Sequence, residues 1–205
     1  MSLITIRSIM PFAGKSELAT ERARTLGGIY ARHGARVRVA RTIAGADAER
    51  IRLYIMYDNG TSMGQIWEKC RTDPSLVKLL QEREVDPEGS LSGPAVYRTV
   101  YGQMEPDYPV VQEREYAMSR DKVADALALM PGIEALGKGL DIKIAATVPV
   151  FSNEMNRLTA VYFFRSLAQM GTAMDGIYMS AEFQSIVTEA AAFGSLTKSR
   201  IISSM

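Results

Sequence analysis

The amino-acid sequence predicts an α+β fold in which one β-α-β-β-α-β unit occurs twice and the two copies close into one barrel. Three observations predict it. Matching residues recur in the same order in the two halves, and the expected helices and strands also follow the same order in both. The length of 205 residues fits two units of about 100 residues each.

The internal repeat is clearest where Arg36–Tyr57 is aligned with Asp141–Tyr162, a shift of 105 positions (141 − 36). Similar residues then coincide: Val37, Val39, Thr42, Arg52, Leu53 and Tyr57 fall on Ile142, Ile144, Thr147, Arg157, Leu158 and Tyr162. Further along, Met63-Gly64 falls on Met170-Gly171, a shift of 107 positions (170 − 63). A duplicated unit tolerates this two-residue difference, because loops accept insertions.

Each half is expected to begin with a strand and a helix. The first strands are predicted at Leu3–Ile9 and Val110–Tyr116. Apolar residues at three- and four-residue spacing predict a helix over Lys15–His33. The corresponding segment, Asp121–Lys138, contains Pro131, which predicts a kinked or split helix because proline cannot donate the backbone hydrogen bond.

Two central strands are expected next in each half. Arg36–Thr42 and Asp141–Val148 alternate with period two, as half-buried strands do. Ile51–Tyr57 and Arg157–Phe164 are rich in aromatic and branched residues, which are favoured in strands.

Short helices and a last strand complete each unit. Ser62–Cys70 is a predicted helix, and Asp73 followed by proline marks the start of another. Ser180 takes the place of Asp73 in the second half. The last strands are predicted at Ala95–Tyr101 and Leu196–Ile202.

Two segments interrupt this pattern. Val85–Pro94 is rich in Gly, Pro and Ser and is expected to be a mobile loop, whereas Gln103–Pro109 contains two prolines and is expected to be a short, stiff connection. The predicted boundaries are therefore residues 1–104 for the first repeat, 105–109 for the linker and 110–205 for the second repeat.

The composition is that of an ordinary globular protein, with 47% hydrophobic and 23% charged residues. A net charge of +1 gives no reason to expect nucleic acid or a membrane as partner. One cysteine and one histidine exclude a disulfide and a Cys-rich or multi-histidine metal site. The start does not resemble a signal peptide and no apolar run approaches about 20 residues, so a cytoplasmic location is expected.

The order β-α-β-β-α-β is that of the ferredoxin-like split unit. Such a unit leaves one sheet face free of helices, and two units close these faces on one another. The duplicated chain therefore resembles the dimeric α/β-barrel superfamily, which includes antibiotic-biosynthesis monooxygenase-like, NIPSNAP-like and EthD-like families, with both copies fused in one chain. The resemblance rests on topology and duplication, and no family's catalytic residues can be transferred to this sequence.

The strand periodicity also predicts which side chains face the space between the sheets. Two cation pairs related by the repeat, Arg38 with Lys143 and Arg52 with Arg157, are expected there. A buried arginine needs an acceptor, because an unpaired buried charge is costly. Either protein carboxylates such as Glu113 and Asp141 supply it, or an anionic ligand does.

Two residues outside these strands, His33 and Trp67, are candidates for a chemical role. His33 lies in the last turn of a helix, where capping explains its placement and a catalytic role is the less favoured interpretation. Families of this fold that bind haem use a histidine on a helix under the sheet, and no histidine lies in the second helix of either half. Trp67 shares a helix face with Met63 and Cys70, which indicates a core or pocket wall.

Two functions follow from the sequence. The first is a small-molecule-binding protein, with a cofactor-independent, monooxygenase-like activity on an apolar or aromatic substrate as its finer form. The expected ligand-binding residues are Arg38, Arg52, Tyr54, Tyr57, Trp67, Tyr97 and His33, with Arg52 or Arg38 orienting an oxyanion. The alternative is a non-enzymatic interaction or assembly module, including a homo-oligomer, with a well-packed interior and no cavity.

Overall fold

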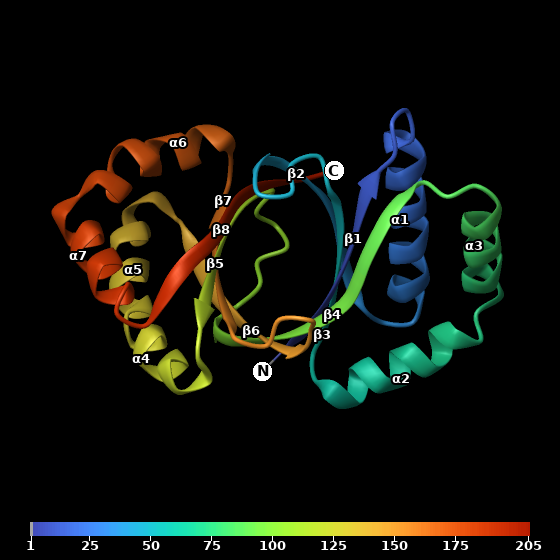
Figure 1. Cartoon of the computed structure of the whole chain (residues 1–205), viewed down its shortest axis with the longest axis horizontal. Helices are drawn as coiled ribbons and strands as arrows, with labels where there is room; N and C mark the ends of the chain where they lie inside the picture. The colour runs from blue at the N-terminus through green and yellow to red at the C-terminus, as the bar shows by residue number, and fades with distance from the viewer. Residues whose placement is uncertain (1) are drawn as a thin grey trace.

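The structure is a computed structural model that describes residues 2–205, and its strands form one closed antiparallel barrel (Figure 1). The order around the barrel is β1-β3-β2-β8-β5-β7-β6-β4. The strands are β1 (Leu3–Pro11), β2 (Arg36–Gly45), β3 (Ile51–Tyr57), β4 (Gly89–Gly102), β5 (Val110–Met118), β6 (Lys143–Phe151), β7 (Arg157–Phe164) and β8 (Gly194–Ser204). The predicted α+β fold of two β-α-β-β-α-β units is confirmed.

Helices cover the barrel on two opposite sides (Figure 1). The helices of the first half are α1 (Ser16–Arg32), α2 (Gly60–Arg71) and α3 (Pro74–Val85). Those of the second half are α4 (Val123–Ala128), α5 (Met130–Gly137), α6 (Leu167–Asp175) and α7 (Ala181–Ala190), with 3₁₀ turns at Arg120–Lys122, Lys138–Leu140 and Ile177–Met179. No helix in the described part of the chain is both long enough and apolar enough to cross a membrane.

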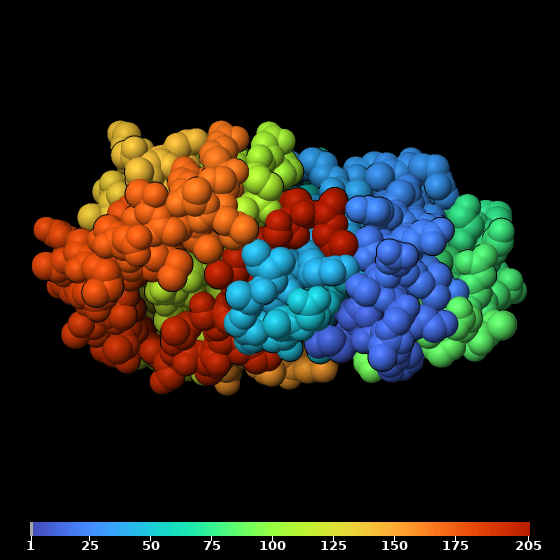
Figure 2. Space-filling view, turned by 90° about the horizontal axis from the view of Figure 1, so that it is seen from above, coloured from blue at the N-terminus to red at the C-terminus, as the bar shows by residue number. Residues whose placement is uncertain are grey.

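Two strand pairs join the halves. β2 pairs with β8 over Ala40–Gly45, and β4 pairs with β6 over Val96–Gly102. In Figure 2 the β2–β3 region and the C-terminal strand lie against each other at the seam between the halves. Each unit therefore completes the hydrogen bonding of the other unit's edge strands, which are otherwise exposed to unwanted pairing.

The outer faces of the strands pack beneath the helices, as the period-two pattern predicted. Leu53 and Ile55 lie in the core under α1 and α2, and Leu158 and Ala160 lie in the matching core of the second half. Burying side chains of this size contributes roughly 1.5–3 kcal/mol each. These two apolar cores fix which face of each strand points toward the helices. The residues at the alternate positions therefore point into the barrel.

One end of the barrel is closed by the segment between β4 and β5, which crosses inside the ring outline (Figure 1). Met104 packs on the interior core, and Tyr108 is buried there beside Phe163. The Tyr108 hydroxyl donates to Asp141 Oδ2 at 2.9 Å, and the Arg165 guanidinium lies 3.8 Å from the ring centroid. The connection predicted as a stiff spacer thus also fills the barrel.

The helix break at Pro131 was predicted correctly, but the loop over Val85–Pro94 was not. The helix predicted to break near Pro131 is indeed divided into α4 and α5, with Pro131 in the first turn of α5. The prediction of a mobile loop over Val85–Pro94 was wrong for its second part, because β4 already starts at Gly89 and pairs with Pro11 of β1. A Cβ at Gly89 would lie 2.2 Å from the Met10 carbonyl oxygen, so glycine here permits close strand approach.

Because the halves share one ring, we expect them to unfold together. Leu158→Ala in β7 should lower the free energy of unfolding by about 2–5 kcal/mol through loss of buried surface and a cavity. The same loss should appear in the fluorescence of Trp67, the only tryptophan, which lies in the first half. Urea unfolding followed by fluorescence and by far-UV circular dichroism measures this, with Leu53→Ala at the equivalent position as the matched variant. An unchanged fluorescence midpoint in Leu158→Ala would mean that the halves unfold separately.

Candidate functional site

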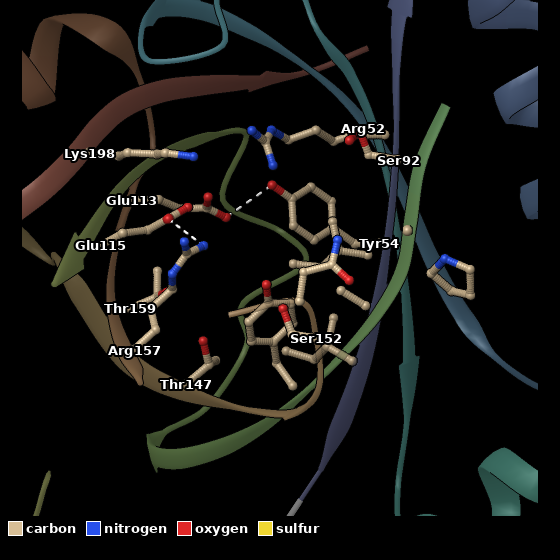
Figure 3. Close-up of a pocket in the computed structure, with 18 of the residues that line it drawn as sticks. Arg52, Tyr54, Ser92, Glu113, Glu115, Thr147, Ser152, Arg157, Thr159 and Lys198 are labelled. Carbon is tan, nitrogen blue, oxygen red and sulfur yellow. Dashed lines mark hydrogen bonds and ion pairs between the residues drawn. The ribbon is translucent and has the colours of Figure 1, made fainter. Parts of the chain in front are cut away.

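The barrel interior is open at the end opposite the β4–β5 connection and encloses a cavity of about 770 Å³ (Figure 3). The β2–β3 turn and the β6–β7 loop both contribute to its wall, through Asp47 and through Ser152 and Asn153. These are the equivalent hairpins of the two repeats. The cavity therefore belongs to neither half alone.

The cavity has a charged wall and an apolar wall. The charged wall holds five cations and three carboxylates, a formal excess of two positive charges: Arg50, Arg52, Arg157, Lys198, Arg200, Asp47, Glu113 and Glu115. The apolar and aromatic lining comprises Ile4, Ile6, Tyr54, Tyr97, Val150, Phe151, Met155 and Val161. Such a division suits a ligand with an anionic group on an apolar body.

Arg200 is the centre of the charged wall. Its Nε lies 2.9 Å from Glu113 Oε2, its Nη1 lies 2.9 Å from Asp47 Oδ2, and its Nη2 pairs with Glu115 Oε1. The Arg200 side chain is only 3% exposed, so it needs all three carboxylates nearby to offset its loss of hydration. Because Asp47 belongs to the first repeat and Arg200 to the second, the ion pair between these two residues also joins the two repeats.

The β2–β3 turn brings Asp47 over this wall. Asp47 has a φ of 60°, a left-handed conformation in which aspartate is enriched. Its carboxylate lies 3.3 Å from Arg52 Nη2 and 3.7 Å from Arg50 Nε. Arg52 also donates from Nε to Thr42 Oγ1 at 3.1 Å. Burial opposes the charge of Arg52, but the nearby acidic groups, Tyr54 first and then Glu113 and Asp47, outweigh it and raise the pKa of Arg52 above its usual value.

Arg157, the repeat partner of Arg52, occupies the facing side of the cavity (Figure 3). Its Nη1 lies 2.6 Å from Glu115 Oε2, and its Nη2 pairs with Glu154 in the β6–β7 loop. The expectation that Arg52 and Arg157 face the space between the sheets is therefore confirmed. Their acceptors are the protein's own carboxylates, which leaves Lys198 without an ion pair among residues 2–205.

Tyr54 and Glu113 link the charged wall to the apolar one. The Tyr54 hydroxyl donates to Glu113 Oε1 at 3.0 Å, as the dashed line in Figure 3 marks. Burial, together with the negative charge of Glu113, raises the pKa of Tyr54 far above its usual value. The phenol therefore stays protonated and acts as a hydrogen-bond donor.

The structure brings together only part of the predicted ligand-binding set. Arg52, Tyr54 and Tyr97 line the cavity. Arg38 points into the barrel too, but at the closed end, where Nη2 donates to the Pro109 carbonyl oxygen at 2.9 Å. Its repeat partner Lys143 is half exposed and pairs with Asp141 at the barrel rim.

The other three predicted residues lie outside the barrel, beneath the helices. Trp67 Nε1 donates to the Tyr57 hydroxyl at 2.9 Å, and both side chains pack on the outer core of the first half. His33 Nε2 lies 2.9 Å from Asp73 Oδ2 at the ends of α1 and α3. The predicted residues therefore do not line one cavity, because Tyr57 and Tyr54, three residues apart on one strand, face opposite sides of the sheet.

Several residues of the charged wall were not predicted as site residues. Glu113 was considered only as a partner for arginine, and Glu115, Lys198 and Arg200 were not considered. Their spacing does carry a signal, because charges two residues apart on one strand share a face: Glu113 with Glu115, and Lys198 with Arg200. Asp47 has no such signal, since its position depends on the conformation of a turn.

A haem group does not fit the residues present. The resemblance includes families that bind haem through a histidine under the sheet, but the only histidine is engaged with Asp73 near the first helices. Under the helices of the second half, the cavity that Met130, Ile133 and Phe183 line measures about 30 Å³. The space is filled by apolar side chains, so we assign no step to haem.

The fold recurs in solved structures of low sequence identity. An anthrone oxidase-like protein superposes with a TM-score of 0.67 at 10% identity, over 100% of this chain and 91% of that one. A monooxygenase-like protein from Listeria innocua gives 0.55 at 11% identity, over 100% and 94%. A chlorite dismutase variant from Candidatus Nitrospira defluvii, in complex with cyanide, gives 0.56 at 8% identity, over 100% and 90%.

No protein-family model matches the sequence, and no curated protein matches it significantly. The structural likeness nevertheless extends over the full chain and includes the two-repeat topology. At these identities it establishes architecture alone. The chain thus has the ferredoxin-like, dimeric α/β-barrel fold of the solved monooxygenase-like and chlorite dismutase-like structures, with both repeats in one polypeptide.

Proposed function

We propose that the chain binds a small organic anion with an aromatic or apolar body in the open end of its barrel, and acts on it as a cofactor-independent, monooxygenase-like enzyme. The observation that carries the proposal is the cavity of about 770 Å³ with an excess of cations on one wall and apolar side chains on the other. This volume lies within the range of roughly 300–1,000 Å³ typical of small-molecule sites.

Lys198 is the group best suited to the ligand's anionic end. The three carboxylates of the wall all pair with arginines, and Lys198 lines the same cavity without a carboxylate partner among residues 2–205. A ligand oxyanion at Lys198 would also lie within the field of Arg52 and Arg157. Its apolar body would then contact Ile6 and Tyr97 on the opposite wall.

The same wall supports proton abstraction from an acidic substrate. Glu113 and Glu115 are carboxylates in a partly dehydrated site and can accept a proton from a phenol, an enol or a C–H next to a carbonyl. Cations around them stabilise the oxyanion that forms. Molecular oxygen would be the oxidant, and the substrate itself would supply the electrons: a CH2 group next to the activated position becomes a carbonyl with one oxygen atom, and its two hydrogens leave with the other oxygen atom as water.

Two further observations favour this proposal over a non-enzymatic assembly module. The assembly alternative expects a well-packed interior, whereas the barrel holds a large cavity. The structures with the same fold include proteins described as monooxygenase-like and anthrone oxidase-like. Those descriptions belong to the other proteins, and they support the enzymatic form of the proposal only through the shared architecture.

The binding part of the proposal is tested at Lys198. A thermal-shift screen with aromatic acids and quinols should find compounds that stabilise the protein. Lys198→Gln should then weaken binding of the aromatic carboxylates by about 10- to 100-fold, because a hydrogen bond to a charged group contributes roughly 1.5–3 kcal/mol. Calorimetric titration measures this, with Lys69→Gln on the exposed face of α2 as the charge-matched control. A screen in which no compound raises the melting temperature would contradict the proposal.

The catalytic part is tested by oxygen uptake with the compounds that bind. We expect Glu115→Gln to lower kcat by about 10²–10⁴-fold, the usual contribution of a general base, while the dissociation constant changes far less. Glu113→Gln is the companion variant, since either carboxylate can accept the proton. If tightly bound compounds cause no oxygen uptake with the wild-type protein, the chain is a binding protein and the enzymatic proposal is wrong.

A further inference from the structure

A second cavity lies outside the barrel, between the first-half sheet and its helices, and measures about 60 Å³. Arg7 of β1 and Arg83 of α3 both line it, together with apolar residues of α1 and β3. Ser8, Ser92 and Gly93 line this cavity and the barrel cavity alike, so only the β1–β4 strand pair separates the two. The two spaces open on opposite faces of the sheet.

Positive charge exceeds negative charge around this second cavity. Glu88, with its side chain only 2% exposed, is the one buried carboxylate here, and it is shared by two guanidinium groups. Arg22 Nη1 lies 2.7 Å from Glu88 Oε2, and Arg83 Nε lies 2.7 Å from Glu88 Oε1. Arg7 has no carboxylate within 4.0 Å among residues 2–205, so three arginines share a single acid.

Two nitrogen donors at this cavity have no acceptor. Arg83 Nη2 and Arg7 Nε are buried and make no hydrogen bond to any described residue. The side chain of Arg83 is 9% exposed. Burial, and after it the positive charges of Arg7 and Arg22, lower the pKa of Arg83 despite its contact with Glu88. Buried donors without partners are costly, and the cavity beside these two offers room for an acceptor.

In the second repeat, the arginine of the first strand has different neighbours. The ladder places Tyr116 opposite Leu158, as it places Arg7 opposite Leu53, so Tyr116 holds the position of Arg7. The arginine of that strand is Arg114, two residues earlier, and its guanidinium packs on aromatic rings. Its Cζ is 4.9 Å from the ring centroid of Tyr178, 5.7 Å from that of Phe183 and 5.8 Å from that of Tyr162. Contact with ring faces stabilises the cation. Arg7 has neither such rings nor a carboxylate, and a cavity lies beside it instead.

We propose that the cavity at Arg7 and Arg83 binds a small oxyanion, such as phosphate, sulfate or a carboxylate group. The free donors Arg83 Nη2 and Arg7 Nε supply its hydrogen bonds, and the oxyanion balances the excess charge left by Glu88. The volume of about 60 Å³ is several times the roughly 10–15 Å³ that one water needs. Leu91, which is 57% exposed, lines the cavity and places it next to solvent.

The test is titration of the wild-type chain with phosphate, sulfate and acetate at constant ionic strength, against chloride as the reference salt. At least one oxyanion should raise the melting temperature saturably and more than chloride does. Arg7→Gln should weaken that binding by about tenfold or more, because it removes a charged donor. Arg7 makes no ion pair, so this variant should remain folded, and its melting temperature in chloride should equal or exceed that of the wild type.

Two controls locate the site. Arg24→Gln, on an exposed position of α1, changes the net charge equally and should bind the oxyanion as the wild type does. Lys198→Gln in the barrel cavity should also leave this binding intact. The inference is overturned if no oxyanion stabilises beyond chloride, if Arg7→Gln binds like the wild type, or if only Lys198→Gln loses binding. The last result would assign the anion to the barrel.

Discussion

Closure of the barrel is the constraint on which the rest of this structure depends. The ring exists only because β2 pairs with β8 and β4 pairs with β6, across the two repeats. Once closed, the ring separates an outer strand face, which packs under helices, from an inner face. Side chains on the inner face must either pack against one another or, where they are charged, form ion pairs. Apolar residues and the β4–β5 connection fill one end, and charged residues line the other.

The charged end illustrates how closure shapes chemistry. Arg200 of one repeat meets Asp47 of the other, and Tyr54 meets Glu113 across the same space. Each buried arginine has a carboxylate partner, mostly from its own repeat, and Asp47 adds one ion pair between the repeats. Every carboxylate of this wall pairs with an arginine, and Lys198 has no ion pair among residues 2–205, which is the basis for the proposed binding of an anion. At the outer cavity beside Arg7, buried hydrogen-bond donors of arginine likewise outnumber the acceptors.

The repeats have diverged while keeping their framework. Arg52 and Arg157 remain equivalent and both face the barrel cavity, with different carboxylate partners. The arginines of the first strands have not kept one position, because Arg7 lies opposite Leu53, whereas Tyr116 and not Arg114 lies opposite Leu158. Arg7 lies beside a cavity, and Arg114 packs on aromatic rings. Duplication therefore supplied the framework, and local substitutions changed the surroundings of the charged side chains.

The sequence by itself determined the repeat, the order of elements, the strand faces and the break at Pro131, because each depends on local periodicity or backbone chemistry. The same periodicity predicted that Arg52 and Tyr54 face the space between the sheets, where both line the cavity. Only the tertiary structure decided that Arg38 lies at the closed end of the barrel, that Gly89 begins a strand, and that Asp47 reaches Arg200. Those facts depend on which distant strand lies alongside, on how closely backbones approach and on the conformation of a turn, and no local pattern encodes them.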